Sequence, residues 1–64
     1  MKEKVFQFLT EAKLPVKTED IVKQFNIDRN EAQKIINDLV LEGKIETDRC
    51  FNKVIKVSKG GKNG

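Results

Sequence analysis

Five side chains able to recognise nucleic-acid bases fall within nine consecutive residues of this 64-residue chain. They are Arg29, Asn30, Gln33, Lys34 and Asn37. Asn and Gln can pair with both edge groups of adenine in the major groove, and Arg or Lys can pair with guanine. The same polar set is also typical of an ordinary solvated helix surface, and residues 29–42 carry two bases against three acids. The segment is therefore a candidate base-contacting surface whose own charge supplies no attraction to phosphate.

A second group of candidate contacts is basic and lies toward the C-terminus. Residues 49–64 carry five bases and no acid, whereas residues 1–48 carry eight bases and ten acids. The five bases are Arg49, Lys53, Lys56, Lys59 and Lys62. A basic block favours contact with phosphates, and we expect the first three of these residues to supply it. The alternative is a solvated basic end that contacts nothing.

Composition argues against catalysis, metal binding and membrane insertion. The chain has no histidine, and its single cysteine, Cys50, can form neither an internal disulfide nor a four-ligand zinc site. Glu19 and Asp20 are better explained as the acidic start of a helix than as a catalytic acid pair. The longest apolar run, residues 39–41, is far shorter than a membrane span. We therefore expect a cytoplasmic non-enzyme without cofactor, metal or small-molecule substrate.

Two N-terminal segments have the apolar spacing of amphipathic helices. The first spans residues 2–13 and ends before Pro15, because proline lacks the backbone N–H that a helix requires. The second spans residues 19–25, and Thr18 in front of it has the chemistry of a helix cap. The second helix is too short to be stable without tertiary packing.

A third and longer helix is expected over residues 29–42. Its buried stripe consists of Ala32, Ile35, Ile36, Leu39 and Val40. The opposite face then carries Asn30, Lys34, Asn37 and Leu41, with Gln33 and Asp38 beside them. Asp28 and Glu31 form a capping-box pattern at the start, and Gly43 suits the left-handed residue after a helix end. The candidate base-contacting residues therefore lie on the outward side of this helix.

After Gly43 the apolar period changes from about 3.6 to 2, which predicts strands. We expect a hairpin of residues 45–47 and 53–57, joined by residues 48–52. A short extended segment is expected at residues 14–16, between the first two helices. The hairpin places the basic residues next to the third helix.

This order of elements resembles the winged helix-turn-helix family. The similarity covers residues 3–58 and is carried by residues 21–28, 32–39 and 40–45, the last containing Gly43-Lys44-Ile45. It implies an α+β fold of three helices with a C-terminal two-stranded β-hairpin wing in one domain, residues 1–58, followed by a disordered, glycine-rich basic tail, residues 59–64. It also implies that the third helix enters the major groove of double-stranded DNA while the wing contacts the backbone. A small transcriptional regulator or DNA-associated accessory factor fits this arrangement.

The same resemblance leaves other functions open, because winged helices have several kinds of partner. One alternative is a protein-binding adaptor or a homodimer, using Leu41 and Phe51 as exposed apolar contacts. A second is RNA binding, because the chain is also similar to the winged-helix protein of the small ribosomal subunit. A weaker resemblance, over residues 27–39, is to winged helices that bind Z-form nucleic acid; that family has asparagine and tyrosine where this chain has Gln33 and Asn37.

Overall fold

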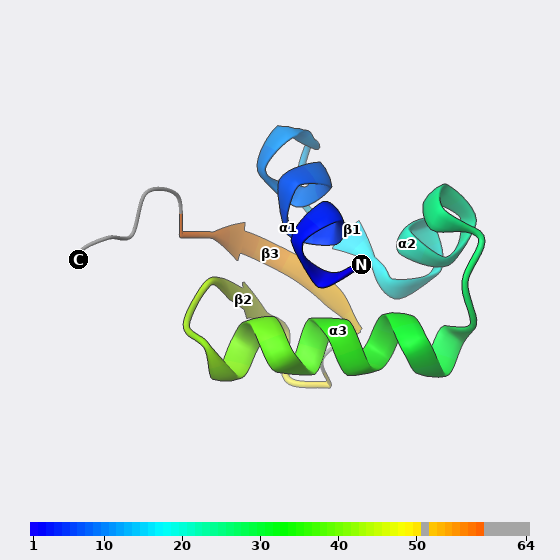
Figure 1. Ribbon diagram of the computed structural model, residues 1–64. Coiled ribbons are helices and arrows are strands. Elements are labelled where there is room, and N and C mark those ends of the chain that lie inside the picture. Colours follow the sequence, from blue (N-terminus) through cyan, green and yellow to red (C-terminus); the bar gives the residue numbers. More distant parts are fainter. Residues whose placement is uncertain (51, 59–64) are drawn as a thin grey trace.

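The computed structural model describes residues 1–50 and 52–58, which form three helices and one antiparallel sheet of three strands (Figure 1). The elements are α1 (Lys2–Glu11), β1 (Val16–Lys17), α2 (Thr18–Phe25), α3 (Arg29–Leu41), β2 (Ile45–Thr47) and β3 (Lys53–Val57). The predicted α+β class is confirmed. The predicted disordered tail, residues 59–64, and the candidate contact Phe51 lie outside the described residues. No helix in the described part of the chain has the length and apolar character to cross a membrane.

The sheet has the order β1-β3-β2, so β3 is its central strand. On one side β3 pairs with β2, and on the other it pairs with β1, with Val16 opposite Val54 and Lys17 opposite Lys53. The predicted hairpin of residues 45–47 and 53–57 forms, but the sheet has three strands instead of two, because residues 16–17 pair with the other edge of β3. Pairing with β1 satisfies backbone groups that the second edge of β3 would otherwise leave open. Such pairing between distant segments leaves no local signal in the sequence.

The starts of α2 and α3 are capped differently from the prediction. Thr18 is the first residue of α2, and the carboxylate of Asp20 accepts a hydrogen bond of 3.0 Å from the backbone N–H of Lys17. The hydroxyl of Thr18 is directed toward the β2–β3 turn instead of the helix start. At α3, the side chain of Asp28 makes no capping hydrogen bond, so the capping box predicted with Glu31 does not form. At Thr18 a tertiary partner, the Asn52 carbonyl, has replaced the local one.

The helix ends follow the sequence more closely. α1 ends at Glu11, two residues before the predicted end, because Ala12 is already extended with ψ of 158°. Gly43 follows α3 with φ of 75°, the left-handed conformation predicted for it. Asn26 ends α2 in the same conformation, with φ of 55°. These two residues turn the chain at the C-terminal ends of α2 and α3.

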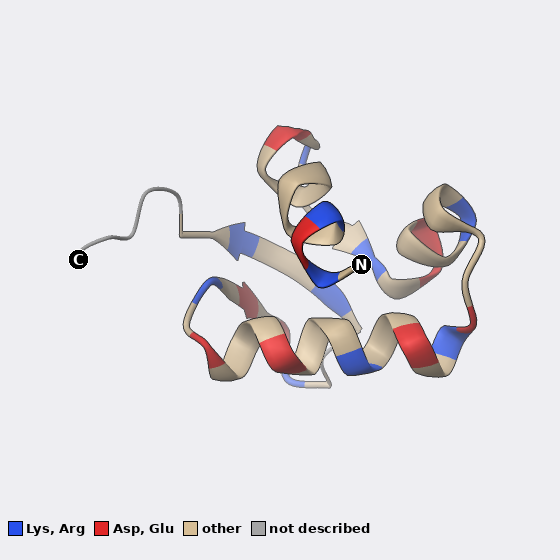
Figure 2. Ribbon diagram, in the orientation of Figure 1, with Lys and Arg blue, Asp and Glu red and all other residues tan. Residues whose placement is uncertain are grey.

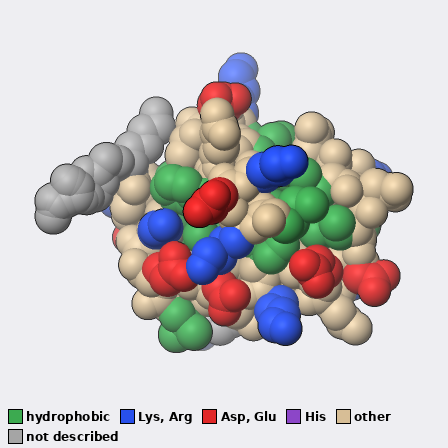
Figure 3. Space-filling view, viewed as in Figure 1, with side chains coloured by type: hydrophobic (Ala, Val, Ile, Leu, Met, Phe, Trp, Pro, Cys, Tyr) green, Lys and Arg blue, Asp and Glu red, His purple; other side chains and the backbone are tan. Residues whose placement is uncertain are grey.

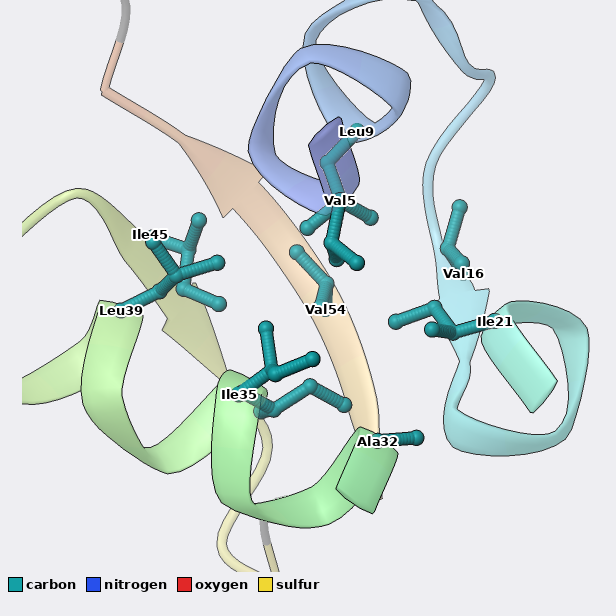
Figure 4. Packing of buried hydrophobic residues seen from close by; sticks show 10 residues of the cluster. Val5, Leu9, Val16, Ile21, Ala32, Ile35, Leu39, Ile45 and Val54 are labelled. Atoms are coloured by element: carbon teal, nitrogen blue, oxygen red, sulfur yellow. The ribbon is translucent and has the colours of Figure 1, made fainter. Parts of the chain in front are cut away.

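Side chains from all three helices and all three strands meet in one core (Figure 4). Its buried apolar members are Val5, Leu9, Val16, Ile21, Ala32, Ile35, Ile36, Leu39, Ile45 and Val54. Figure 4 shows Val54 of β3 between Val5 of α1 and Ile35 of α3. The stripe predicted for α3 is buried except for Val40, which is half-buried. This burial fixes which side of α3 faces outward.

Candidate nucleic-acid interface

The outward side of α3 carries the polar residues selected from the sequence. Asn30, Lys34 and Asn37 are exposed, and Gln33 is half-buried. α3 runs along one side of the molecule, with acidic and basic residues interspersed along it (Figures 1 and 2). The space-filling view shows the same mixture of charges, with apolar side chains between them, on the face turned toward the viewer (Figure 3). The helix therefore offers hydrogen-bonding groups and little net charge.

A surface depression of about 360 Å³ lies where the starts of α2 and α3 meet the β2–β3 turn. It is lined by Lys17, Thr18, Glu19, Arg29, Asp48, Asn52 and Lys53. Each of these residues lies at or beside the end of a helix or strand. The fold therefore brings the ends of five elements, β1, α2, α3, β2 and β3, to one place. The lining holds three bases and two acids.

Two of the three bases face each other across the sheet. Lys17 and Lys53 are directly opposite in the antiparallel pairing of β1 with β3. Like charges at such positions repel each other and oppose strand pairing. Neither ammonium group has an ion-pair partner within residues 1–50 and 52–58. An anion in the depression would relieve this repulsion.

The two acids of the depression are already engaged by other groups. Oδ1 of Asp48 accepts backbone hydrogen bonds from Asn52 at 2.8 Å and Lys53 at 3.2 Å, which closes the β2–β3 turn. Oε2 of Glu19 lies 3.5 Å from the Arg29 guanidinium, and both side chains are about two-thirds exposed, at 65% and 63%. Such an exposed pair contributes little to stability and exchanges partners readily. Arg29 is therefore available to a competing anion.

The structure divides the predicted basic residues into two groups. Arg29 and Lys53 line the depression, together with Lys17, which the sequence analysis did not select. Arg49 is exposed in the β2–β3 turn but does not line the depression. Lys56 is exposed on β3 and lies opposite Glu46 of β2, so a charge of opposite sign faces it. Lys17 was not predicted as a site residue because it enters the depression through the pairing of β1 with β3, which no local sequence motif predicts.

A chain of polar contacts joins the depression to the outward side of α3. The Thr18 hydroxyl donates to the carbonyl oxygen of Asn52 at 3.0 Å and lies 3.5 Å from Oε1 of Gln33. Nε2 of Gln33 donates to Oδ1 of Asn37 at 3.3 Å. The predicted base-contacting residues Gln33 and Asn37 thus contact each other, and Thr18 lies behind them.

Other candidate features lie elsewhere on the surface. Leu41 is 84% exposed at the end of α3, as the sequence analysis expected. Cys50 is a free and exposed thiol. Among the described residues, no three potential metal ligands of the His, Cys, Asp or Glu type lie together.

Comparison of the chain with protein-family models, curated proteins and solved structures gives no match. Among the side chains of the depression and of α3, the pair of facing lysines is the feature that most favours an anion, because like charges at such positions repel each other.

Proposed function

We propose that this protein binds double-stranded DNA through the outward side of α3 and the basic depression at its start. The observation that carries the proposal is the facing pair Lys17 and Lys53, which has no acid partner among the described residues and lies beside the amide-bearing side of α3. Phosphate neutralises such a pair, whereas exposed amides suit base edges. A small transcriptional regulator or DNA-associated accessory factor is the corresponding role.

The dimensions of α3 suit this mode of binding. Its 13 residues give a length of about 20 Å, and the major groove is about 12 Å wide. With α3 in the groove, the depression at its first turn lies at the groove edge, where the phosphates are. Asn30, Lys34 and Asn37 then face the base edges, and Arg29 lies between the two kinds of contact.

We further infer that the arrangement is that of a winged helix-turn-helix. In this interpretation α2 and α3 form the helix-turn-helix, and the paired strands β2 and β3 form the wing beside it. Two features support it: the connection between α2 and α3 is only residues 26–28, and the β2–β3 turn lies against the starts of both helices at the depression. The fold by itself does not identify the partner, because this arrangement has many kinds of partner.

The test is a residue-resolved NMR titration of the labelled protein with a mixed-sequence duplex, at low and then moderate salt. We expect shifts in the depression and on the outward side of α3 that weaken as salt rises. A parallel titration with an RNA hairpin distinguishes RNA binding from DNA binding. The absence of shifts with the duplex at low salt would exclude the proposal.

A paired-variant experiment then assigns the contact to the depression. Lys17→Gln with Lys53→Gln should weaken duplex binding and reduce the slope of log affinity against log salt by up to about 2. The matched control, Lys4→Gln with Lys23→Gln, removes the same charge from exposed helix positions that do not line the depression. An equal loss in both double variants would show that only net charge matters.

A second candidate function is protein binding, and the exposure of Leu41 is the observation that favours it. A leucine that is 84% exposed on the same side of α3 as Asn37 can anchor a partner. Leu41→Asp should then abolish capture of a protein partner and leave duplex binding unchanged. If it weakens duplex binding as strongly as the lysine changes do, Leu41 is part of the DNA interface.

A further inference from the structure

The depression at the start of α3 contains an anion of the protein's own, the carboxylate of Glu19. Oε2 of Glu19, in the first turn of α2, lies 3.5 Å from the guanidinium of Arg29, the first residue of α3. Both residues line the depression together with Lys17 and Lys53. The other acid of the lining, Asp48, accepts two backbone hydrogen bonds that close the β2–β3 turn. Glu19 is therefore the acid of this lining that can move away without opening the turn.

The contact between Glu19 and Arg29 is a loose one. Its 3.5 Å separation is longer than the about 2.7–2.9 Å of a strong charge-assisted hydrogen bond, and the two side chains are about two-thirds exposed. Exposed ion pairs of this kind contribute little to stability. Guanidinium groups form bidentate, charge-assisted hydrogen bonds with phosphate. A phosphate group can therefore displace the Glu19 carboxylate from Arg29.

We propose that Glu19 is an internal competitor of phosphate: it holds Arg29 in the free protein and releases Arg29 when a phosphate group enters the depression. The proposal rests on the proposed function for the source of that phosphate, which is the backbone of duplex DNA. Exchange at Arg29 replaces one ion pair by another, so the net gain comes from Lys17 and Lys53, which face each other without an acid partner among the described residues. Glu19 therefore disfavours anions that reach only Arg29 and favours an anion that also contacts the lysines.

The first test uses the free protein and does not depend on DNA. Inorganic phosphate is titrated near neutral pH at constant ionic strength, and the backbone amide signals of the depression are followed by NMR. Glu19→Gln keeps the size of the side chain and removes its charge, so it should bind phosphate about two- to fivefold more tightly than the wild type. Glu31→Gln is the matched control, because Glu31 lies in the first turn of α3 and makes no ion pair within the described residues. Equal phosphate affinities in the two variants would overturn the proposal, as would the absence of shifts in Glu19→Gln.

The second test is a double-mutant cycle of Glu19 and Arg29, with duplex affinity as the measured quantity. Both Glu19→Gln and Glu31→Gln remove a charge that repels the duplex, but only the first also frees Arg29. Glu19→Gln should therefore raise duplex affinity about two- to fivefold more than Glu31→Gln does. In an Arg29→Gln background, the two changes should have equal effects. An advantage of Glu19→Gln that persists without Arg29 would show that Glu19 acts by repulsion alone, and would overturn the proposal.

Failure of this proposal can be distinguished from failure of the proposed function. If the wild type binds no duplex while Glu19→Gln binds phosphate more tightly than Glu31→Gln, the proposed function fails and the competition at Arg29 stands. If the wild type binds the duplex and the two variants do not differ with either ligand, DNA binding stands and Glu19 is not a competitor. Thermal unfolding checks that both variants are folded, which the exposure of Glu19 and Glu31 leads us to expect.

Discussion

At the C-terminal end of α3, acidic and basic side chains pair with one another, whereas at its start two lysines face each other with no acid between them. Glu42 forms an ion pair with Lys2 of α1 and lies 3.5 Å from the ammonium of Lys44. Lys44 also lies 5.5 Å from the centre of the Phe6 ring. The charges at this end are satisfied within the protein.

The start of α3 differs because its bases have fewer internal partners. Arg29 has one exposed acid partner, Glu19, and the facing lysines Lys17 and Lys53 have none in the part of the chain that the structure describes. Figure 1 places this end beside α2 and the other end beside β2. The comparison teaches that charge counts alone do not locate a binding surface. The more specific observation is that two like charges, Lys17 and Lys53, face each other at one place.

The largest expected effect comes from destabilising α3 at its centre, because this should disrupt both ends of the helix at once. Ile36 is fully buried in the middle of α3, and Ile36→Ala should cost roughly 2–5 kcal/mol of unfolding free energy. Because small domains have little stability to lose, much of the protein should unfold. Chemical denaturation measures the change. If it is below about 1 kcal/mol, or if only one end loses amide protection, α3 does not act as a single unit.

Reversing one charge at the start of α3 should move stability and binding in opposite directions. Lys17→Glu places opposite charges across β1 and β3, which should stabilise the fold by about 0.2–1 kcal/mol. The same change should reduce duplex affinity more than Lys17→Gln does. Thermal unfolding and fluorescence anisotropy measure the two quantities. A loss of stability in Lys17→Glu would show that the facing lysines do not repel each other.

Two lysines on β3 should differ in their contribution to binding. Lys53 faces Lys17, whereas Lys56 faces Glu46. Lys53→Gln should therefore lower the salt slope by about 1, and Lys56→Gln should change it little. Salt titrations of the two variants make the comparison at equal net charge. Equal slopes would favour the sequence-based grouping of all basic residues over the structural one.

The smallest effect concerns pH at the C-terminal end of α3. The hydrogen bond with Lys2 lowers the pKa of Glu42 below its ordinary 4.5, and the same bond raises the pKa of Lys2 above 10.5. The Glu42 contribution is therefore present above pH 4.5 and is lost as the pH falls through the lowered pKa. The Lys2 contribution is present below pH 10.5 and is lost as the pH rises through the raised pKa.

The measurement is thermal unfolding of the wild type and Glu42→Gln between acid and neutral pH. At neutral pH the wild type should be slightly more stable than Glu42→Gln, and this difference in stability should shrink in acid. Glu11→Gln is the control, because Glu11 makes no ion pair with the described residues. A difference that grows in acid would contradict the lowered pKa of Glu42.

Much of the fold was accessible from local patterns. The helices lie within two residues of their predicted bounds, because each has an apolar stripe and a recognisable stop, such as Pro15 or Gly43. Capping was predicted less well: Thr18 has the chemistry of a cap, but its hydroxyl bonds to Asn52, far along the chain. Where a side chain has a possible partner nearby in the sequence and another far along the chain, the tertiary structure decides between them. Sequence spacing reveals only the nearby partner.

Only part of the candidate site could be predicted from the sequence. The amide-bearing side of α3 followed from helical period, and the structure places Asn30 and Asn37 there. The depression did not follow, because it combines the ends of five elements, and Lys17 enters it only through pairing with Lys53. Arg49 and Lys56, selected for charge, do not line it.

The sequence by itself determined three amphipathic helices, the change of period after Gly43, and the excess of bases after residue 48. These are local properties, set by side-chain type and by the geometry of each element. Only the tertiary structure decided that β1 joins the sheet and brings Lys17 opposite Lys53, and that Thr18 lies beneath Gln33. Such juxtapositions depend on the packing of the whole core, which is why the unpartnered charge became visible only in the folded chain.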